Sequence, residues 1–357
     1  MALTGGPSLA EKVAFLSCGA AYRPAASDVR RHETHMSEVF LAGDKAYKLK
    51  KPVKFPYLDF STLPRREAAC RAELTLNRRL APDVYANITP IVHSQSGLSI
   101  GGEGEVVDWL VVMKRLDDHQ MLNRLIEERR LHRWHLDRLA ALLVQFYRRA
   151  RPIFISPAIH KFQLCRSLAY NRHVLSDRRF NLPVGTIRYI DTMQRRFLAE
   201  RADLLADRVI TRHIVDGHGD LRPEHIWIGD PVRIIDCLEF NDQLRMVDPF
   251  DEIAFLCLEC ERLGARWAGQ YLRRRLVHAL HNGHSDELFL FYRCYRAMLR
   301  ARLAVAHLLE AQPRTPEKWQ PLARTYMRLA AADALRLERA LRRRVGRPRL
   351  HRLEAAV

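Results

Sequence analysis

No apolar run in the sequence approaches the roughly 20 residues that a membrane-spanning helix requires. Near the amino terminus, the apolar patch at residues 13–16 is too short for the core of a signal peptide. Cysteine is sparse, and the seven cysteines are odd in number and scattered, which is typical of reduced thiols. A single C-x-x-C, Cys257 and Cys260, has no second pair nearby, so we interpret it as packing. These absences predict a cytoplasmic protein without a membrane span.

Several nucleotide-binding and metal-binding motifs are also missing. The chain has no G-x-x-x-x-G-K-[ST], which excludes P-loop chemistry, and no G-x-G-x-x-G ahead of its first predicted hairpin. Its sixteen histidines show no H-E-x-x-H or comparable zinc spacing. No internal repeat or low-complexity linker points to a further domain. The hydrophobic content of 48% is nevertheless sufficient for a substantial core, in one bilobal unit or in two domains.

Lysine is scarce as well, and its placement is informative. Only nine of the 59 basic residues are lysines, and five of these nine lie within residues 45–54. Two short runs with strand character, 37–41 and 45–49, flank the turn at 42–44, which predicts a hairpin. Lys48 and Lys50 share one face of the second strand. An ammonium group contacts phosphates as a compact point charge, so we favour Lys48 as a phosphate ligand, with Lys50 close behind. An exposed basic hairpin is the alternative.

Two carboxylates are delivered to one end of a second predicted hairpin. His218, Gly219 and Asp220 precede an apolar strand at 226–228, a turn at 229–231, and a strand at 232–235 that ends on Asp236. Phosphoryl transfer uses one carboxylate to orient or deprotonate the attacking hydroxyl and another to hold the metal that bridges the nucleotide phosphates. The pattern therefore indicates an ATP-dependent phosphotransferase.

The same stretch resembles a known family. His218-Gly-Asp-Leu-Arg-Pro-Glu-His225 resembles the H-G-D-x-H-x-x-N catalytic loop of the aminoglycoside phosphotransferase-like family and the H-R-D-L-K-P-E-N loop of protein kinases. Ile234-Ile-Asp-Cys-Leu-Glu239 is similar to the family's I-D-[WFC]-x-E. Asp248-Pro-Phe-Asp251-Glu-Ile-Ala resembles the D-x-x-x-D-L-A that opens the next helix. The resemblance implies that this chain corresponds to the phosphotransferase part of such proteins. It would lack the P-loop ATPase domain that some relatives carry in addition.

The resemblance implies an α+β, bilobal, protein kinase-like fold. We expect a small β-sheet lobe at residues 1–115 that binds the nucleotide and carries one helix. A large, mainly helical lobe would follow at 116–345, with the catalytic hairpin at 213–240 and a basic tail at 346–357. ATP and Mg²⁺ are the implied cofactors, and the acceptor would be a hydroxylated small molecule.

The resemblance also implies roles for individual residues. Asp220 would be the base and Asp236 would bind the metal, while His218 and Asp251 would support the loop. Arg222 falls where protein kinases place a catalytic-loop lysine, so it would neutralise the transferred phosphoryl group, although a solvated arginine is the alternative.

On the nucleotide side, the phosphate-binding lysine needs an acidic partner from the predicted helix at 65–80. Glu73 matches the family's helix glutamate best, and Glu67 is the other candidate. The apolar strand 109–116 is similar to the strand and hinge that link the two lobes. Adenine would be bound there by backbone groups around Met113–Arg115. The stretch 33–37 would cover the phosphates.

One position departs from the family: His225 stands where the metal-binding Asn is expected. Mg²⁺ prefers oxygen ligands, whereas Mn²⁺ tolerates imidazole better. Three interpretations follow. His225 binds a softer metal; or Glu239 or Glu224 takes the second metal-binding role and His225 is structural; or the protein is an impaired pseudokinase that acts as a nucleotide sensor or scaffold.

The formal net charge of +18 bears on the partner. Part of it lies in Arg336–Arg352, which holds eight arginines and one acid, Glu338. Such a stretch is compatible with nucleic acid, but no interleaved aromatic motif accompanies it, so we expect nucleic-acid binding to be a minor alternative. A strongly basic protein repels polycations such as aminoglycosides. We therefore expect a neutral or anionic hydroxylated acceptor. The sequence makes no prediction of the oligomeric state.

Overall fold

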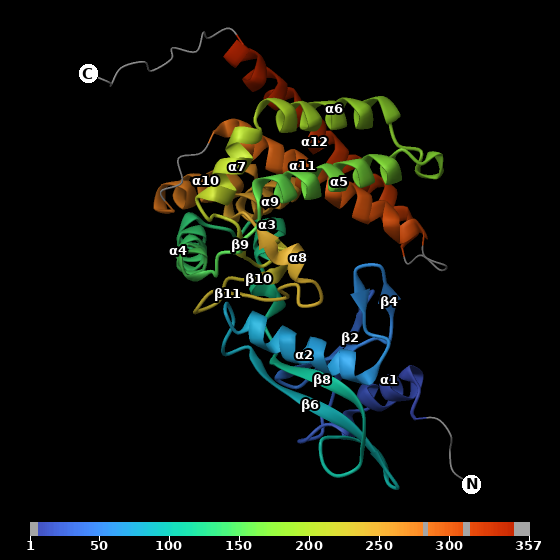
Figure 1. The fold of residues 1–357 in the computed structure, drawn as a ribbon. Helices are drawn as coiled ribbons and strands as arrows, with labels where there is room; N and C mark the ends of the chain where they lie inside the picture. The colour runs from blue at the N-terminus through green and yellow to red at the C-terminus, as the bar shows by residue number, and fades with distance from the viewer. Residues whose placement is uncertain (1–5, 281–284, 310–314, 346–357) are drawn as a thin grey trace. The chain divides into compact units, whose positions relative to one another are not determined.

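The computed structural model describes residues 6–280, 285–309 and 315–345 (Figure 1). The chain divides into two compact units. The first, which we call the sheet unit, comprises the residues up to Leu131 together with His218–Arg245. The second, the helical unit, comprises His132–Gly217 and the chain from Met246 onward. The predicted α+β combination of a β-sheet part and a mainly helical part is confirmed.

The sheet unit is built around one antiparallel sheet. Its strand order is β1-β2-β3-β8-β6-β7. The bounds are β1 Val29–Glu33, β2 Ser37–Ala42, β3 Lys45–Lys50, β6 Tyr85–Ser94, β7 Gly97–Ile100 and β8 Glu105–Lys114. The predicted hairpin at 37–49 is therefore confirmed as β2 and β3, joined by Gly43 in a positive-φ conformation (φ 60°). The predicted strand at 109–116 begins four residues earlier and ends two residues earlier, as β8.

The two faces of this sheet pack against different helices because successive side chains of a strand point to opposite sides. Tyr47 and Leu49 of β3 join the apolar core that also includes Leu16 of α1 (Leu9–Ser17). The opposite face carries Val111, the strand partner of Lys48, and packs under α2 (Leu63–Asn77). Figure 1 shows α2 lying along β8 and β6. The lysines of β3 at even positions therefore face the side of α2.

The remaining elements of the sheet unit are short. They are η1 Gly19–Ala21, β4 Lys54–Phe55, β5 Leu58–Asp59, η2 Asp118–Gln120, α3 Leu122–Glu127, η4 Pro223–His225, β10 Ile226–Trp227, β11 Arg233–Ile234 and α8 Asp242–Arg245. The predicted second hairpin is confirmed as β10 and β11. It is anchored by the Ile228 N–H, which donates to the Gln120 carbonyl at 2.8 Å, and by a bridge between Trp227 and Met121.

The helical unit holds most of the long helices. They are α4 Arg133–Arg149, α5 Pro157–Leu175, α6 Val184–Glu200, α7 Ala202–Ile210, α9 Pro249–Arg262, α10 Arg266–Ala279, α11 Asp286–Ala306 and α12 Pro316–Val345, with η3 Arg178–Phe180, η5 His307–Leu309, and the paired strands β9 Val215–Asp216 and β12 Met246–Val247. Buried side chains of α6, α9, α11 and α12 form one core. In the described ranges, no helix is both long and apolar enough to cross a membrane.

Two stretches that carry apolar residues at helical spacing, 120–150 and 187–209, are interrupted in the structure. The stretch 120–150 is split between α3 and α4, because Arg129 adopts a positive φ of 55° that ends the first helix. The stretch 187–209 is split at Arg201, which leaves helical geometry (φ −131°) and forms a buried ion pair with Glu287. The basic tail 346–357, and with it the end of the Arg336–Arg352 stretch, lies outside the described residues.

Candidate active site

Both candidate lysines of β3 reach the same glutamate of α2. The Lys48 Nζ lies 2.8 Å from Glu73 Oε1, and the Lys50 Nζ lies 2.6 Å from Glu73 Oε2. Glu73 and Lys50 are fully buried, whereas 14% of the Lys48 side chain is exposed. The alternative acid, Glu67, is bound to Arg71 on the surface of the same helix. Burial thus distinguishes two glutamates that the helical pattern left equivalent.

The segment after β11 completes this cluster. Asp236 Oδ1 lies 2.8 Å from the Lys48 Nζ, and Glu239 forms an ion pair with Lys50. Residues separated by 188 positions along the chain are thereby joined. Each lysine is shared between Glu73 and one carboxylate of the segment 236–239. We call these five residues the lysine–carboxylate cluster.

The charges of the cluster shift the pKa values of its members. Burial alone would lower the pKa of Lys48, but Asp236 and Glu73 outweigh it and raise that pKa well above its ordinary value. Burial opposes ionisation of Glu73 and Asp236, yet Lys48 lowers the pKa of both carboxyls, and Lys50 further lowers that of Glu73. For Glu239, burial dominates and raises the pKa. Lys48, Glu73 and Asp236 are therefore charged at neutral pH.

The backbone at Asp236 is held in an unusual conformation. Its φ of 61° lies in the left-handed region, which Asp tolerates better than most residues. The Asp236 N–H donates to the Tyr85 hydroxyl at 3.1 Å. The next N–H, that of Cys237, donates to Asn77 Oδ1 at 2.8 Å, and the Asn77 amide donates to the Glu73 carbonyl at 2.9 Å. Tyr85 and Asn77 thus fix the turn that directs the Asp236 carboxylate toward Lys48.

Sequence reasoning missed Tyr85 and Asn77. Asn77 had a detectable signal, because it lies four residues after Glu73 and so on the same face of α2. Tyr85 begins β6 within an ordinary strand pattern, and no local signal marks it.

The loop before Asp220 is fixed by His218 and Gly219. His218 is fully buried; its Nδ1 accepts from the Asp220 N–H at 3.3 Å, so its Nε2–H donates to the Ile235 carbonyl at 2.9 Å. Gly219 has a φ of 90°, and a Cβ there would lie 2.9 Å from the Leu238 side chain. The loop and the segment that follows β11 and carries Asp236 are therefore held together.

His225 lies between the two candidate catalytic carboxylates. Its Nδ1 is 3.7 Å from Asp220 Oδ2, and its Nε2 is 3.5 Å from Asp236 Oδ2. Nδ1–H donates to the Asp220 carbonyl at 2.9 Å, and Nε2 accepts from Arg222 at 2.9 Å. Burial, followed by the charge of Arg222, lowers the pKa of His225, so the ring is neutral at pH 7. It acts as an uncharged spacer in this arrangement.

Arg222 connects the loop that carries Asp220 to the His225 ring. Its Nε donates to Asp220 Oδ2 at 2.9 Å while its Nη2 binds His225. The guanidinium is thus positioned beside both the candidate base and the ring that faces Asp236. Glu224, the alternative metal ligand, lies 4.0 Å from the Arg222 Nη1.

The described residues hold no group of three or more His, Cys, Asp or Glu side chains arranged for a metal ion. In phosphoryl-transfer sites, however, Mg²⁺ is bound by one or two carboxylates together with substrate phosphates. The Asp236 side chain is 46% exposed and fits that mode. The His225 Nε2 is bound to Arg222, and Glu239 is bound to Lys50. The donor set therefore fits one carboxylate ligand, Asp236.

The predicted adenine-binding segment is partly committed to the sheet. Met113 pairs with Ala46 and Tyr85, and its side chain is half-buried. The Lys114 N–H donates to the Val84 carbonyl and the Arg115 N–H to the Asp44 carbonyl, each at 2.8 Å. Two of the backbone N–H groups that were expected to bind adenine, those of Lys114 and Arg115, are thus engaged in hydrogen bonds within the protein.

Two further predicted residues or segments have other neighbours. Asp251 belongs to the helical unit, where its carboxylate binds Arg296 through two hydrogen bonds of 2.8 and 2.6 Å. In the stretch 33–37, the Thr34 hydroxyl accepts from the Ser37 N–H at 2.9 Å, closing the turn between β1 and β2. Its side-chain oxygen therefore holds the turn.

Sequence comparison finds relatives of this chain that are themselves uncharacterized. No protein-family model matches the chain. Over 315 residues it is 35% identical to an uncharacterized protein of Mycobacterium tuberculosis (strain ATCC 25618 / H37Rv) and to one of Mycobacterium bovis (strain ATCC BAA-935 / AF2122/97). The match covers 87% of this chain, which spans 58% of the length of these curated relatives.

Two solved structures resemble the chain over nearly their whole lengths. One is a choline/ethanolamine kinase family protein from Mesorhizobium loti (TM-score 0.55, 16% identity, 93% of this chain and 97% of that one). The other is choline kinase from Cryptosporidium parvum Iowa II (TM-score 0.54, 9% identity, 94% and 96%). The chain shares the fold of these kinases, so the resemblance predicted from its motifs is confirmed for the fold.

Proposed function

We propose that this protein is an ATP-dependent phosphotransferase that moves the γ-phosphoryl group of ATP to an alcohol hydroxyl of a small molecule. The observation that carries the proposal is the position of the Lys48 Nζ, 2.8 Å from both Glu73 and Asp236. A lysine held by one buried carboxylate and shared with a half-exposed one has a contact that it can exchange for phosphate. Asp236 would hold a Mg²⁺ ion, which would supply positive charge to the transferred phosphoryl group.

Each residue of the cluster then has a distinct task. Lys48, oriented by Glu73, binds the α- and β-phosphates, and Asp236 would hold Mg²⁺. Lys50 binds both Glu73 and Glu239, so it positions the other two groups from a fully buried place. The Lys114 and Arg115 N–H groups are used within the protein, but the next one, that of Leu116, donates to no acceptor among the described residues. We assign adenine recognition to the Leu116 N–H and to the Met113–Arg115 carbonyls.

On the acceptor side, Asp220 orients the substrate hydroxyl and accepts its proton. Arg222, bound to Asp220 at 2.9 Å, supplies positive charge to the transferred phosphoryl group. The neutral His225 ring keeps Asp220 and Asp236 apart without adding charge. His218 holds the loop in which Asp220 lies.

The acceptor class follows from charge. With a formal net charge of +18, the protein attracts neutral or anionic hydroxylated molecules more readily than polycations. The two kinases of similar fold are named for choline and ethanolamine, which are cationic alcohols, so these two compounds belong in the acceptor panel as the contrasting class. We place the reaction in the cytoplasm, in keeping with the free cysteines of the described chain.

The first experiment is a thermal-shift titration with ATP in the presence of Mg²⁺, of Mn²⁺ or of chelator. ATP at 100-fold excess over its Kd should add about 2.7 kcal/mol to the stability of the folded state. We expect a metal-dependent rise that Asp236→Ala abolishes and that the control Asp28→Ala, at an exposed surface pair, retains. No rise with either metal would contradict nucleotide binding.

Turnover separates the enzyme from a pseudokinase. ADP release should depend on the acceptor and fall by about 10³-fold in Asp220→Asn, because general-base catalysis contributes 10²–10⁴-fold. ATP binding without acceptor-dependent turnover on any neutral, anionic or cationic alcohol would instead support the nucleotide-sensing scaffold.

A further inference from the structure

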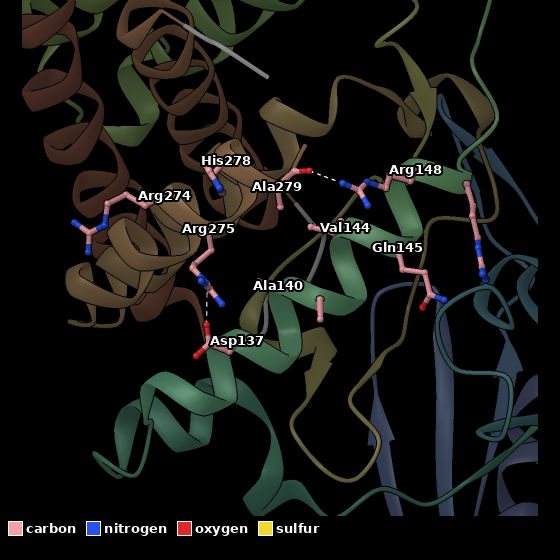
Figure 2. A pocket seen from close by; sticks show the side chains of 11 residues that line it. Asp137, Ala140, Val144, Gln145, Arg148, Arg274, Arg275, His278 and Ala279 are labelled. Carbon is pink, nitrogen blue, oxygen red and sulfur yellow. Dashed lines mark hydrogen bonds and ion pairs between the residues drawn. The ribbon is translucent and has the colours of Figure 1, made fainter. Parts of the chain in front are cut away.

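The helical unit contains a groove between α4 and α10. Its volume is about 740 Å³, within the range of small-molecule sites. Residues of both helices line it, among them Val144 of α4 and Ala279 of α10 (Figure 2). The groove exists because small side chains, Ala140, Ala141 and Val144 on α4 and Ala279 on α10, line it where larger ones would fill the space.

Two contacts between the helices bound this groove. Near one end the Arg275 Nε lies 2.9 Å from Asp137 Oδ1, and near the other the Arg148 Nη2 donates to the Ala279 carbonyl at 2.7 Å (Figure 2). Asp137 and Arg148 are eleven positions apart on α4, which corresponds to about 16 Å along the helix. A long partner helix would meet these bridges, whereas a compact molecule fits between them.

The charge of the lining selects the ligand. Of the eleven lining residues, four are arginines, one is a histidine and one, Asp137, is acidic. Arg275 and Arg148 are already engaged in the bridges. Arg274 and His278 lie four positions apart on α10, hence on one face, and neither side chain binds another described residue. The rim thus offers basic side chains beside an apolar floor.

We propose that this groove binds a small amphipathic organic anion, a molecule with one phosphate or carboxylate head and a short apolar body. The head would bind Arg274 with His278, and the body would cover Ala140, Ala141 and Val144. The inference does not depend on the proposed phosphotransfer, since every residue that it uses belongs to the helical unit and none is part of the candidate active site.

Calorimetric titration with octyl phosphate, below its micelle concentration, tests this site on the full chain. Octyl glucoside supplies the same apolar body without charge, and inorganic phosphate supplies the charge without the body. We expect one-site saturable binding of octyl phosphate and at least tenfold weaker binding of each fragment probe, because each loses one of the two recognised parts. Equal binding of octyl glucoside or of inorganic phosphate would overturn the proposal, as would no saturable binding of octyl phosphate.

Variants locate the binding. Arg274→Gln with His278→Gln removes both side chains proposed to bind the head and leaves the Arg275–Asp137 bridge intact; we expect octyl phosphate affinity to fall by about tenfold or more, the value of one charge-assisted hydrogen bond. The matched control is Arg328→Gln with Arg339→Gln, two exposed arginines of α12, which should leave affinity unchanged. An equal loss in both double variants would overturn the proposal, because it would indicate a general effect of net charge.

A steric variant provides an independent check. Ala141 is exposed on α4, so Ala141→Trp should fold normally and fill the groove. We expect octyl phosphate binding to disappear while the thermal midpoint stays within a few degrees of the wild type. Undiminished binding in this variant would place the ligand elsewhere and contradict the assignment.

Discussion

The buried ion pairs of the helical unit and those of the lysine–carboxylate cluster are built from different cations. In the helical unit, Arg296 binds Asp251 through two parallel hydrogen bonds of 2.8 and 2.6 Å. In the sheet unit, Lys48 is shared between Glu73 and Asp236. A guanidinium fork saturates its carboxylate in one fixed geometry, whereas an ammonium group can exchange one oxygen for another. The arginine pair therefore suits a permanent structural role, and the lysine pair suits a contact that substrate replaces.

The cations of the cluster depart from the general composition of the chain. Fifty of the 59 basic residues are arginines, yet the cations of the lysine–carboxylate cluster are lysines. The helical unit repeats the arginine mode elsewhere: Arg208 binds Asp248 through two hydrogen bonds of 2.7 Å, and Arg293 binds Asp333 at 2.8 Å. In the lysine–carboxylate cluster, each lysine is a point charge that serves two acceptors.

The largest expected effect comes from breaking an arginine pair. Asp251→Ala leaves the Arg296 guanidinium buried without its partner, so we expect the free energy of unfolding to fall by about 3–5 kcal/mol. Chemical denaturation followed by circular dichroism measures it. The control, Asp28→Ala at an exposed pair, should change stability by less than about 0.5 kcal/mol. A loss below 1 kcal/mol in Asp251→Ala would remove the structural role assigned to this pair.

The next prediction separates the two lysines. Lys48→Met removes the exchangeable cation, so kcat/KM for ATP should fall by about 10²–10³-fold, as when one preorganised donor is lost. Lys50→Met leaves Lys48 in place and should reduce kcat/KM by only about tenfold, through misplacement of Glu73. Steady-state kinetics at several ATP concentrations compares them. A larger loss in Lys50→Met would make Lys50 the phosphate ligand.

The two carboxylates that share Lys50 should respond oppositely to pH. The pKa of Glu73 is lowered in the fold, so its stabilisation is present above the ordinary value near 4.5 and is lost as pH falls below it. The pKa of Glu239 is raised, so stability is greatest below about 4.5 and declines as pH rises through the folded value.

Glutamine substitutions test this difference without metal. At pH 7, Glu73→Gln should cost about 2 kcal/mol, because it removes a carboxylate that binds two buried ammonium groups. Glu239→Gln should cost less than half as much, because the neutral form is the one that burial favours. Unfolding titrations at pH 5 and pH 7 measure both variants. An equal cost for the two at pH 7 would contradict the assigned directions.

The smallest expected effect concerns His225, the uncharged ring between Asp220 and Asp236. His225→Asn replaces the imidazole nitrogen near Asp236 with an amide that offers an oxygen, so the apparent affinity for Mg²⁺ should rise by about tenfold relative to that for Mn²⁺. Metal titrations of turnover in both proteins measure the ratio. An unchanged ratio would show that residue 225 does not reach the metal, and a fall in Mn²⁺-supported activity alone would show that His225 is a ligand.

Local patterns in the sequence were sufficient for the elements that carry the site. Two short runs with strand character around the turn at 42–44 predicted β2 and β3, and two apolar runs around the turn at 229–231 predicted β10 and β11. The helix expected at 65–80 is α2, shifted to Leu63–Asn77. These features depend on side-chain periodicity and turn chemistry, which act over a few residues.

Contacts between residues that are far apart in the sequence could not be predicted from local patterns. Glu67 and Glu73 share a helix, and only packing against the sheet decides which one is buried beside the lysines. Arg129 and Arg201 interrupt stretches whose spacing is helical throughout, because backbone conformation and a buried ion pair override periodicity there. The groove between α4 and α10 had no sequence signal, since alanine is common in helices.

By itself, the sequence determined the order of the strands and helices near the site, the loop that carries Asp220, and the turn that leads to Asp236, because each depends on neighbouring residues. Only the tertiary structure decided that Lys48 contacts both Glu73 and Asp236, that Lys50 is buried with Glu239, and that Tyr85 and Asn77 hold the backbone of the turn. The physical reason is that burial and charge pairing are set by distances in space, and residues as far apart as 188 positions become neighbours only when the sheet and α2 have packed.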